Sequence, residues 1–583
     1  MGNVTLPRSR SLTVIAQDPS IRYQLGPKAG QIVTARIRVP AESLAPGPCG
    51  YRLHCIDYDA TSDTYYDTAI PEDQDLYEEP VNGTDKEIAR YNERLLTDPN
   101  FHCQNVYALM MQTLARFEFA LGRRLAWGFG AGHQLKVAPH AFSEANAYYS
   151  EEDQALLFGY FNSVEEEADG ATVFTCLSHD VIVHETTHAL IDGLHTRYTD
   201  PSSPDQAAFH EGMADVVALL SIFALPTIPE VIIDNNFDPG SNLISVDAIT
   251  PDALRKAIGG LADEVGAAIS GVRGEPLRRS MELAPGPDYL AEAEFREPHR
   301  RGEILVAAMM NAFLHMWSER LEHLGEKRAG MLDRSKVVEE GADLASVLLT
   351  SSIRALDYCP PVDLSFNDYL SALLTADQEV RPGSDDRYRL RENVKKSFES
   401  YFIPPAAGTD ANGMWQAPTA DLHYERTHFE PMQRDSDEVF HFVWENRAKE
   451  QLDLDAQAYT QVESVRPCIR VGEDGFTLRE TVAEYVQILK IHAGELPDLK
   501  LNKLPGIPDD KEIYLYGGGA LIFDEYGHLK YHVYNRVCGD KQNDRLRYLN
   551  ETGFFKGKSL RLKFSSLHRA RAYPQIVPVE EGW

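Results

Sequence analysis

The chain has 583 residues and a formal net charge of −32 at pH 7, from 57 basic and 89 acidic side chains. This length is enough for several domains, and the hydrophobic and charged fractions, 43% and 25%, are those of an ordinary globular protein. The negative charge argues against nucleic acid and anionic lipid, because both partners need a basic surface. We therefore expect neither nucleic acid nor a membrane as a partner.

The cysteines and the N-terminal segment indicate in which cellular compartment the protein is expected. The seven cysteines are scattered and form no CxxC pair, which is typical of reduced thiols. The segment MGNVTLPRSRSLTVIAQDPS lacks the apolar region of a secretion signal, and the longest apolar stretches are interrupted or too short to span a bilayer. The sequence predicts a cytoplasmic protein by default, with export by a signal-less route as the alternative.

Residues 1–84 predict a β-rich N-terminal domain. The segments LTVIAQD, QIVTARIRV and YRLHCIDYD alternate or are rich in β-branched and aromatic residues, and clusters of Gly and Pro separate them. The acidic run PEDQDLYEEPVNGTD is the expected connection to a core domain over residues 85–403.

Helical periodicity dominates this core. QNVYALMMQTLARFEFALGRR predicts an amphipathic helix, and the short strands QLKVA, NAYYS and ALLFGYF follow it. VFTCLSHDVIVHETTHALIDG predicts a buried helix closed by Gly193, and DQAAFHEGMADVVALLSIF predicts the next one. Further helices are expected over residues 250–270, 301–320, 336–357 and 366–376.

The C-terminal part of the chain has a different residue pattern from the core domain. PPAAGTDANGMWQAP indicates a linker, placed at residues 404–434. Residues 435–583 are expected to form a small α/β domain, in which TLRETVAEYVQILKI is a helix and GALIFDEYGHLKYHVYN a β-hairpin. The predicted fold class is therefore α+β and multidomain.

HETTH, residues 184–188, has the spacing of a metal-binding helix. His184 and His188 are four residues apart and share one helix face, so both imidazoles can reach one ion. Glu185 lies beside them, where it can reach a water molecule. Two histidines can also meet on a helix by chance, but the apolar neighbours would bury them, and buried imidazoles need partners.

A catalytic zinc site takes three protein ligands, and two residues compete for the third position. On a continuing helix His195 would lie about 10 Å from His188, so it would need a turn at Gly193 to reach the ion. Glu211 lies on the next helix, with Asp215 one turn later on the same face. Buried carboxylates need partners, so Glu211 would bind the metal and Asp215 a ligand imidazole; a solvated face is the alternative.

HETTH followed by ExxxD resembles the thermolysin-like gluzincin family of zinc metallopeptidases. Asp180 precedes His184 as in the DVVAHE run of that family, and NAYY, with Asn146 and Ala147, is similar to its NAFW edge strand. LRRSM resembles the family's LRSM, which makes Arg279 the substrate-binding arginine, with Arg278 as the alternate.

Two later segments extend the resemblance. EPHRRGEILVAA is similar to the segment that carries the family's transition-state histidine, here His299. FNDYLSALLTAD and VKKSFESYFI resemble the closing helices, so the match covers about residues 100–403, in order. It implies a thermolysin-like two-lobed catalytic core, with a mixed β/α N-lobe and a helical C-lobe.

The resemblance also implies the roles of the site residues. Zn²⁺ would be held by His184, His188 and Glu211. Glu185 would be the general base, and Tyr198 and His299 would stabilise the oxyanion. Supporting and substrate-binding positions would be Asp215, Asp180, Asn146, Ala147 and Arg279.

The chain departs from the family at several points. His210 stands where the family has asparagine, and the loop before Tyr198 differs in length. The helix after Asp215 is apolar and lacks acidic calcium ligands, so the sequence does not favour structural Ca²⁺.

The predicted function is a zinc endopeptidase with a peptide or protein substrate. A gluzincin aminopeptidase is one alternative, although the chain lacks the GxMEN-type strand of that branch. A zinc-site binding protein without turnover is another. The terminal domains could also cover the cleft and make the enzyme latent.

Overall fold

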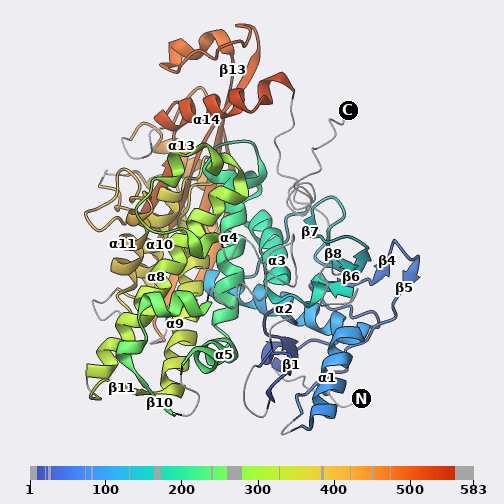
Figure 1. Ribbon diagram of the computed structural model, residues 1–583. Coiled ribbons are helices and arrows are strands. Elements are labelled where there is room, and N and C mark those ends of the chain that lie inside the picture. Colours follow the sequence, from blue (N-terminus) through green and yellow to red (C-terminus); the bar gives the residue numbers. More distant parts are fainter. Residues whose placement is uncertain are drawn as a thin grey trace.

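The computed structural model describes residues 9–557, except for residues 20–21, 24–27, 73, 81–82, 130–131, 163–171, 238–240, 259–278, 327, 383–386, 420–421, 450–451, 453 and 473–474. Within these residues the chain has a mixed α/β architecture (Figure 1). One large hydrophobic cluster extends from the first strand to the C-terminal sheet.

The N-terminal part contains a two-stranded sheet, a five-stranded sheet, a short strand pair and two helices. Strands β1 (Ser9–Ile15) and β2 (Thr34–Pro40) are antiparallel. Helices α1 (Asp85–Thr97) and α2 (Pro99–Leu121) follow. A five-stranded sheet has the order β3-β6-β8-β7, and β9 also pairs with β8. Its strands are β3 (Leu53–Cys55), β6 (Leu135–Phe142), β7 (Ala147–Ser150), β8 (Ala155–Asn162) and β9 (Thr172–Phe174), and the short pair β4 (Tyr58–Asp59) and β5 (Thr64–Tyr65) lies outside it.

The expected separation of residues 1–84 as a domain of their own is wrong. β3 pairs in parallel with β6 of the core. The buried faces of β1 and β2 belong to the same hydrophobic cluster as α2. A two-stranded sheet cannot bury its apolar face alone, so it depends on the helix that covers it. The segment is β-rich as predicted, but it forms part of the core.

Helices form the centre of the molecule. In chain order they are α3 (His179–Leu194), α4 (Pro204–Phe223), α5 (Thr227–Asn236), α8 (Pro298–Glu326), α9 (Arg334–Arg354), α10 (Phe366–Val380) and α11 (Leu390–Ser400). Short strands β10 (Leu243–Ser245) and β11 (Met331–Asp333) pair beside them. These bounds confirm the predicted helices at 301–320, 336–357 and 366–376. The helix expected at 250–270 is helical over 251–258, and its remainder lies outside the described residues.

Two predicted helices differ from the structure. The metal-binding helix begins at His179, because the preceding residues form β9 and a 3₁₀ turn at Thr175–Leu177. TLRETVAEYVQILKI is not a helix but strand β13 (Thr477–His492). Eight consecutive buried residues run along this central strand, so it carries the continuous apolar run that periodicity cannot distinguish from a buried helix.

β13 lies in a four-stranded antiparallel sheet of order β12-β13-β14-β15. The other strands are β12 (Tyr459–Val471), β14 (Glu512–Phe523) and β15 (Leu529–Asn535), so the predicted hairpin is confirmed. Alternate residues of the central strands face opposite sides. Val482 and Ile522 join the main cluster, whereas Ala483 and Leu521 belong to a second cluster with α13 (Ser436–Glu445). The C-terminal sheet is therefore packed directly onto the core.

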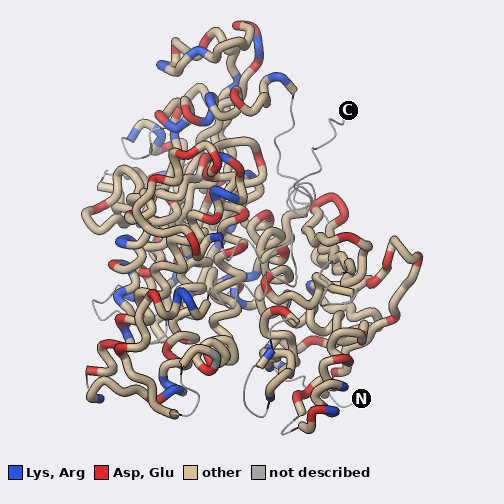
Figure 2. The backbone as a smooth tube through the Cα atoms, in the orientation of Figure 1, with Lys and Arg blue, Asp and Glu red and all other residues tan. Residues whose placement is uncertain are grey.

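The remaining elements lie around this sheet. Residues 404–434 are irregular except for the short helix α12 (Phe429–Met432), and α14 (Asp540–Glu551) follows the last strand. Acidic positions occur in every part of the described chain (Figure 2). Among the residues that the structure describes, no single helix has the length and apolar character to cross a membrane. The bent pair Pro204–Phe223 and Thr227–Asp234, with an angle of 74°, meets those criteria when taken together.

Candidate metal centre

Helix α3 places both histidines of HETTH on one buried face. It begins after Ser178, and Asp180 lies in its first turn, where a negative charge is favoured by the helix dipole. One turn further, the rings of His184 and His188 are perpendicular at 87°, with centroids 4.4 Å apart. Both side chains are fully buried. The predicted pair is thus formed within a single helix.

Helix α4 brings Glu211 to the two histidines. Its carboxylate oxygens lie 3.5 Å from His184 Nε2 and 3.6 Å from His188 Nε2. The three ligand atoms are all within 4.8 Å of one another. Bonds of about 2.0 to 2.1 Å in a tetrahedral set place ligand atoms about 3.3 Å apart, so this donor set fits a zinc-sized ion.

The outer nitrogens of the two histidines are held by residues of α4. Asp215 Oδ1 lies 2.6 Å from His184 Nδ1, the contact predicted from the sequence. His188 Nδ1 lies 2.9 Å from His210 Nδ1, a contact that was not predicted. Burial lowers the pKa of His210 to about 4, so its ring is neutral at pH 7. Carboxylate or imidazole acceptors on Nδ1 leave both Nε2 lone pairs for a metal.

The candidate base, Glu185, faces strand β7. The backbone N–H of Tyr149 donates to Glu185 Oε2 at 3.0 Å, and both residues are buried. β7 is the last strand in the order β3-β6-β8-β7, so its outer edge lies against α3. Ala147 lies on this strand and Asn146 directly precedes it. The side-chain NH₂ of Asn146 is buried without a hydrogen-bond partner among the described residues.

Helix α8 supplies His299 near its N-terminus. His299 Nε2 is 3.4 Å from Glu211 Oε2, and Nδ1 is 2.7 Å from Glu297 Oε1. Burial would raise the pKa of Glu297, but the hydrogen bond and charge of His299, together with hydrogen bonds from the backbone N–H groups of Arg300 and His299, outweigh it and lower this pKa below its usual value. The structure therefore brings His299 to the predicted metal ligands, and Glu297 orients its ring.

Two glycines set the position of α8 against α4. A Cβ on Gly212 would lie 2.9 Å from the carbonyl oxygen of Gly302, and one on Gly302 would lie 3.0 Å from the backbone nitrogen of Gly212. Side chains at these positions would push the helices apart. This close approach brings His299, three residues before Gly302, to Glu211.

Arg279 lies beside helix α8, near the candidate metal ligands but at the exposed margin of the site. Its side chain is 42% exposed, and its guanidinium nitrogen is 3.9 Å from Glu303 Oε1 on α8. Glu303 also pairs with Arg300. The alternate candidate, Arg278, lies outside the described residues.

The structure does not bring Tyr198 to the metal ligands as an oxyanion donor. Its hydroxyl donates to the carbonyl oxygen of Pro360 at 2.9 Å, and its ring stacks on His195 with centroids 4.4 Å apart. The side chain is completely buried. A hydroxyl has one proton to donate, so the predicted role of Tyr198 is wrong and the residue is part of the packing.

His195 is not a ligand of this centre. It is the C-cap of α3, and its Nε2 lies 3.0 Å from the carbonyl oxygen of Leu356. Its Nδ1 lies 3.2 Å from Glu484 of β13. His195 therefore lies at the end of the helix, and its contacts connect α3 to the C-terminal sheet.

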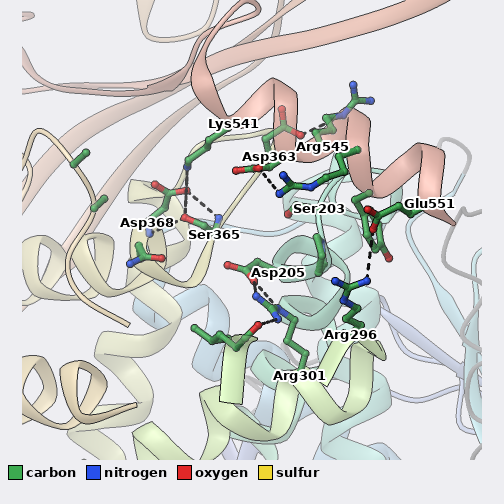
Figure 3. Close-up of a pocket in the computed structure, with 18 of the residues that line it drawn as sticks. Ser203, Asp205, Arg296, Arg301, Asp363, Ser365, Asp368, Lys541, Arg545 and Glu551 are labelled. Atoms are coloured by element: carbon green, nitrogen blue, oxygen red, sulfur yellow. Dashed lines mark hydrogen bonds and ion pairs between the residues drawn. The ribbon is translucent and has the colours of Figure 1, made fainter. Parts of the chain in front are cut away.

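A cavity of about 510 Å³ lies between the starts of α4, α8 and α10 and helix α14 (Figure 3). Charged side chains on its walls are paired: Arg301 with Asp205, Arg545 with Asp363, Lys541 with Asp368 and Arg296 with Glu551. Among the described residues that line it, His184, His188 and Glu211 do not occur. The candidate centre is therefore defined by ligand geometry and not by this cavity.

No protein-family model matches the chain, and no curated protein matches it either.

Proposed function

We propose that the chain is a zinc-dependent metallopeptidase with a thermolysin-like two-lobed core and a peptide or protein substrate. The observation that carries this proposal is the convergence of His184, His188 and Glu211 within 4.8 Å. Two imidazoles and one carboxylate are the ligand set of gluzincin zinc sites. When bound there, Zn²⁺ would acidify a water molecule and polarise the scissile carbonyl.

The surrounding residues support hydrolysis over metal storage. The backbone N–H of Tyr149 donates to the Glu185 carboxylate and orients it, and this carboxylate would take a proton from water and pass it to the leaving amine. His299 faces Glu211 and is oriented by Glu297, so it can donate to the developing oxyanion. A base and an oxyanion donor beside a three-ligand metal site are the groups that peptide hydrolysis needs.

The edge strand supports a peptide as substrate. β7 is the last strand in the order β3-β6-β8-β7, and an extended peptide can add to the outer edge of such a strand through backbone hydrogen bonds. The buried side-chain NH₂ of Asn146 at the start of this strand would gain a partner in a substrate carbonyl. Arg279, on the exposed margin, would contact the substrate further out.

The test compares wild type with Glu185→Gln, and with Glu93→Gln of α1 as an exposed control. Bound zinc is measured by elemental analysis, and cleavage of an unfolded protein is followed by mass spectrometry, before and after limited treatment with a serine protease. We expect the same zinc content in all three proteins and loss of cleavage in Glu185→Gln alone.

The cleavage products separate the alternatives. Internal fragments support an endopeptidase, whereas stepwise loss of N-terminal residues would identify an aminopeptidase. Cleavage by Glu185→Gln at the wild-type rate would contradict the mechanism. If zinc-loaded wild type cleaves nothing before or after treatment with the serine protease, the chain is a zinc-binding protein without peptidase activity.

A further inference from the structure

A second group of metal-ligating side chains lies in the N-terminal part of the core. His102, His140 and Cys176 each offer one ligand atom, and these atoms lie within 4.8 Å of one another. The three residues are 1%, 3% and 0% exposed. We propose that they form a second, buried zinc site distinct from the centre on α3 and α4, in which three protein ligands leave the fourth position to a further donor. This inference does not depend on the proposed peptidase activity.

The three ligands come from separate elements that meet at one point. His102 lies in the first turn of α2, His140 lies on β6, and Cys176 is in the 3₁₀ turn between β9 and α3. The ring centroid of Phe174 lies 4.8 Å from that of His102 and 5.3 Å from that of His140. A buried cation here would link three parts of the fold that are distant in sequence.

Asp57 orients one imidazole for metal binding. Its two oxygens lie 3.0 Å from the backbone nitrogen of His140 and 2.9 Å from His140 Nδ1, and Asp57 is 1% exposed. With the ring proton on Nδ1, the lone pair of Nε2 points away from Asp57. A carboxylate on the far nitrogen of a histidine is the usual outer partner in protein zinc sites.

The second imidazole is directed at the same point. His102 Nδ1 lies 2.7 Å from His140 Nε2. His140 Nε2 is the acceptor in this pair, because the Nδ1 proton of His140 faces Asp57. A metal ion would take the place of the proton shared by the two nitrogens, which would then lie about 3.3 Å apart, as in a tetrahedral set, in place of 2.7 Å.

The donor set and its charge select the metal. Two imidazoles and one thiolate are borderline and soft ligands, which favour Zn²⁺ over Mg²⁺ or Ca²⁺. A divalent cation, the thiolate of Cys176 and the carboxylate of Asp57 sum to zero charge. This neutrality matters because an unbalanced charge in a fully buried site is strongly unfavourable.

The location indicates what the site would do. Cys176 lies eight residues before His184 and immediately precedes the helix that carries HETTH. A zinc ion held by Cys176 would fix the start of α3 against α2 and β6. The site would therefore set the position of the histidine helix.

Cobalt substitution distinguishes the two sites in the full-length protein, because the His184, His188 and Glu211 set contains no sulfur. We expect two metal ions per chain by elemental analysis of the zinc form. The Co²⁺ form should show a near-ultraviolet thiolate-to-cobalt charge-transfer band. Cys176→Ser should lose this band and one metal ion. Cys538→Ser, at a half-buried thiol elsewhere, should retain both.

The reciprocal variant completes the test. A double His184→Ala and His188→Ala variant should lose one metal ion and keep the charge-transfer band. If Cys176→Ser does not fold, His102→Asn tests the same site, and should also lose one metal ion. A metal-loaded, folded wild-type chain without the charge-transfer band, or a band that survives Cys176→Ser, would overturn the proposal.

Discussion

Nδ1 of His188 lies 2.9 Å from Nδ1 of His210, and both rings are fully buried. One of these nitrogens must carry a proton. When His188 binds a metal through Nε2, its proton lies on Nδ1, and His210 becomes the acceptor. His210, the residue before the candidate ligand Glu211, would therefore fix the tautomer of His188.

We predict that His210→Leu lowers metal affinity about 10- to 100-fold, the usual effect of losing such a partner. His210→Asn should keep most of the affinity, because its amide oxygen can still accept from His188. Competition with a chelating dye measures the metal dissociation constant of each variant. His441→Leu, at an exposed histidine of α13, is the control. Equal affinity in all variants would mean that the contact only packs the two rings.

The candidate histidine ligands could be predicted because their spacing is local, whereas Glu211 on the next helix was indicated by the ExxxD motif. His184 and His188 share a face in any helix, and Asp215 follows Glu211 by one turn. The partners from other elements could not be predicted in this way. The N–H that holds Glu185 comes from Tyr149, and its place depends on where an edge strand lies relative to a helix far along the chain.

The sequence predictions that differ from the structure also have physical causes. Tyr198 was assigned from a loop of altered length, and the structure directs its hydroxyl to Pro360. β13 was predicted as a helix, because a strand buried on both faces loses its alternating pattern. The N-terminal strands looked like a separate domain, because nothing in their own sequence indicates that α2 covers them.

Gly302 should be intolerant of a side chain. A helical Gly→Ala change ordinarily stabilises by up to about 1 kcal/mol. Here the added Cβ would meet the backbone nitrogen of Gly212 at 3.0 Å and the carbonyl oxygen of Ala208 at 3.1 Å. We expect Gly302→Ala to destabilise by about 1 to 3 kcal/mol, measured by urea unfolding, because backbone atoms cannot move aside.

A glycine outside the helices offers a contrast. A Cβ on Gly83 would meet the side chain of Pro80 at 3.3 Å and no backbone atom that close, so Gly83→Ala should destabilise less than Gly302→Ala. Gly302→Ala should also weaken metal-dependent activity, because it moves His299 away from Glu211. A Gly302→Ala protein as stable as wild type would show that the two helices can separate without cost.

The end of α3 is tied to the C-terminal sheet through Glu484. Burial alone would raise the pKa of Glu484, but the charges of Arg466 and His195 outweigh it and lower this pKa from 4.5 to about 2. A depressed carboxyl pKa stabilises the fold fully above the unfolded value. This stabilisation is lost as pH falls from about 4.5 toward 2, and amounts to about 3 kcal/mol.

Glu484→Gln should remove this part of the acid sensitivity. The free energy of unfolding of wild type should fall steeply between pH 4.5 and 2, and the slope should be smaller in the variant, which is already less stable at pH 7. Urea unfolding across this range measures both. Glu512→Gln, at an exposed residue of β14, is the control. Identical slopes in wild type and Glu484→Gln would show that Glu484 does not control acid unfolding.

Arg470 connects the C-terminal sheet to the helical core. It is 1% exposed and pairs with Asp357 of the core and with Glu480 of β13. Arg123 binds Asp357 from the other side at 2.6 Å. Arg470→Met keeps the side-chain length but leaves Glu480 and Asp357 with less compensation. Breaking a buried pair from one side costs about 3 to 5 kcal/mol, and thermal unfolding should show a loss of that size.

The nearby Arg479 is exposed and offers a control on the same sheet. Arg479→Met should change stability by less than about 0.5 kcal/mol, as surface substitutions usually do. If Arg470→Met unfolds in one transition at lower temperature, the sheet and the core are one cooperative unit. Two separate transitions, with metal binding retained after the first, would instead show that the sheet unfolds independently, as a true C-terminal domain would.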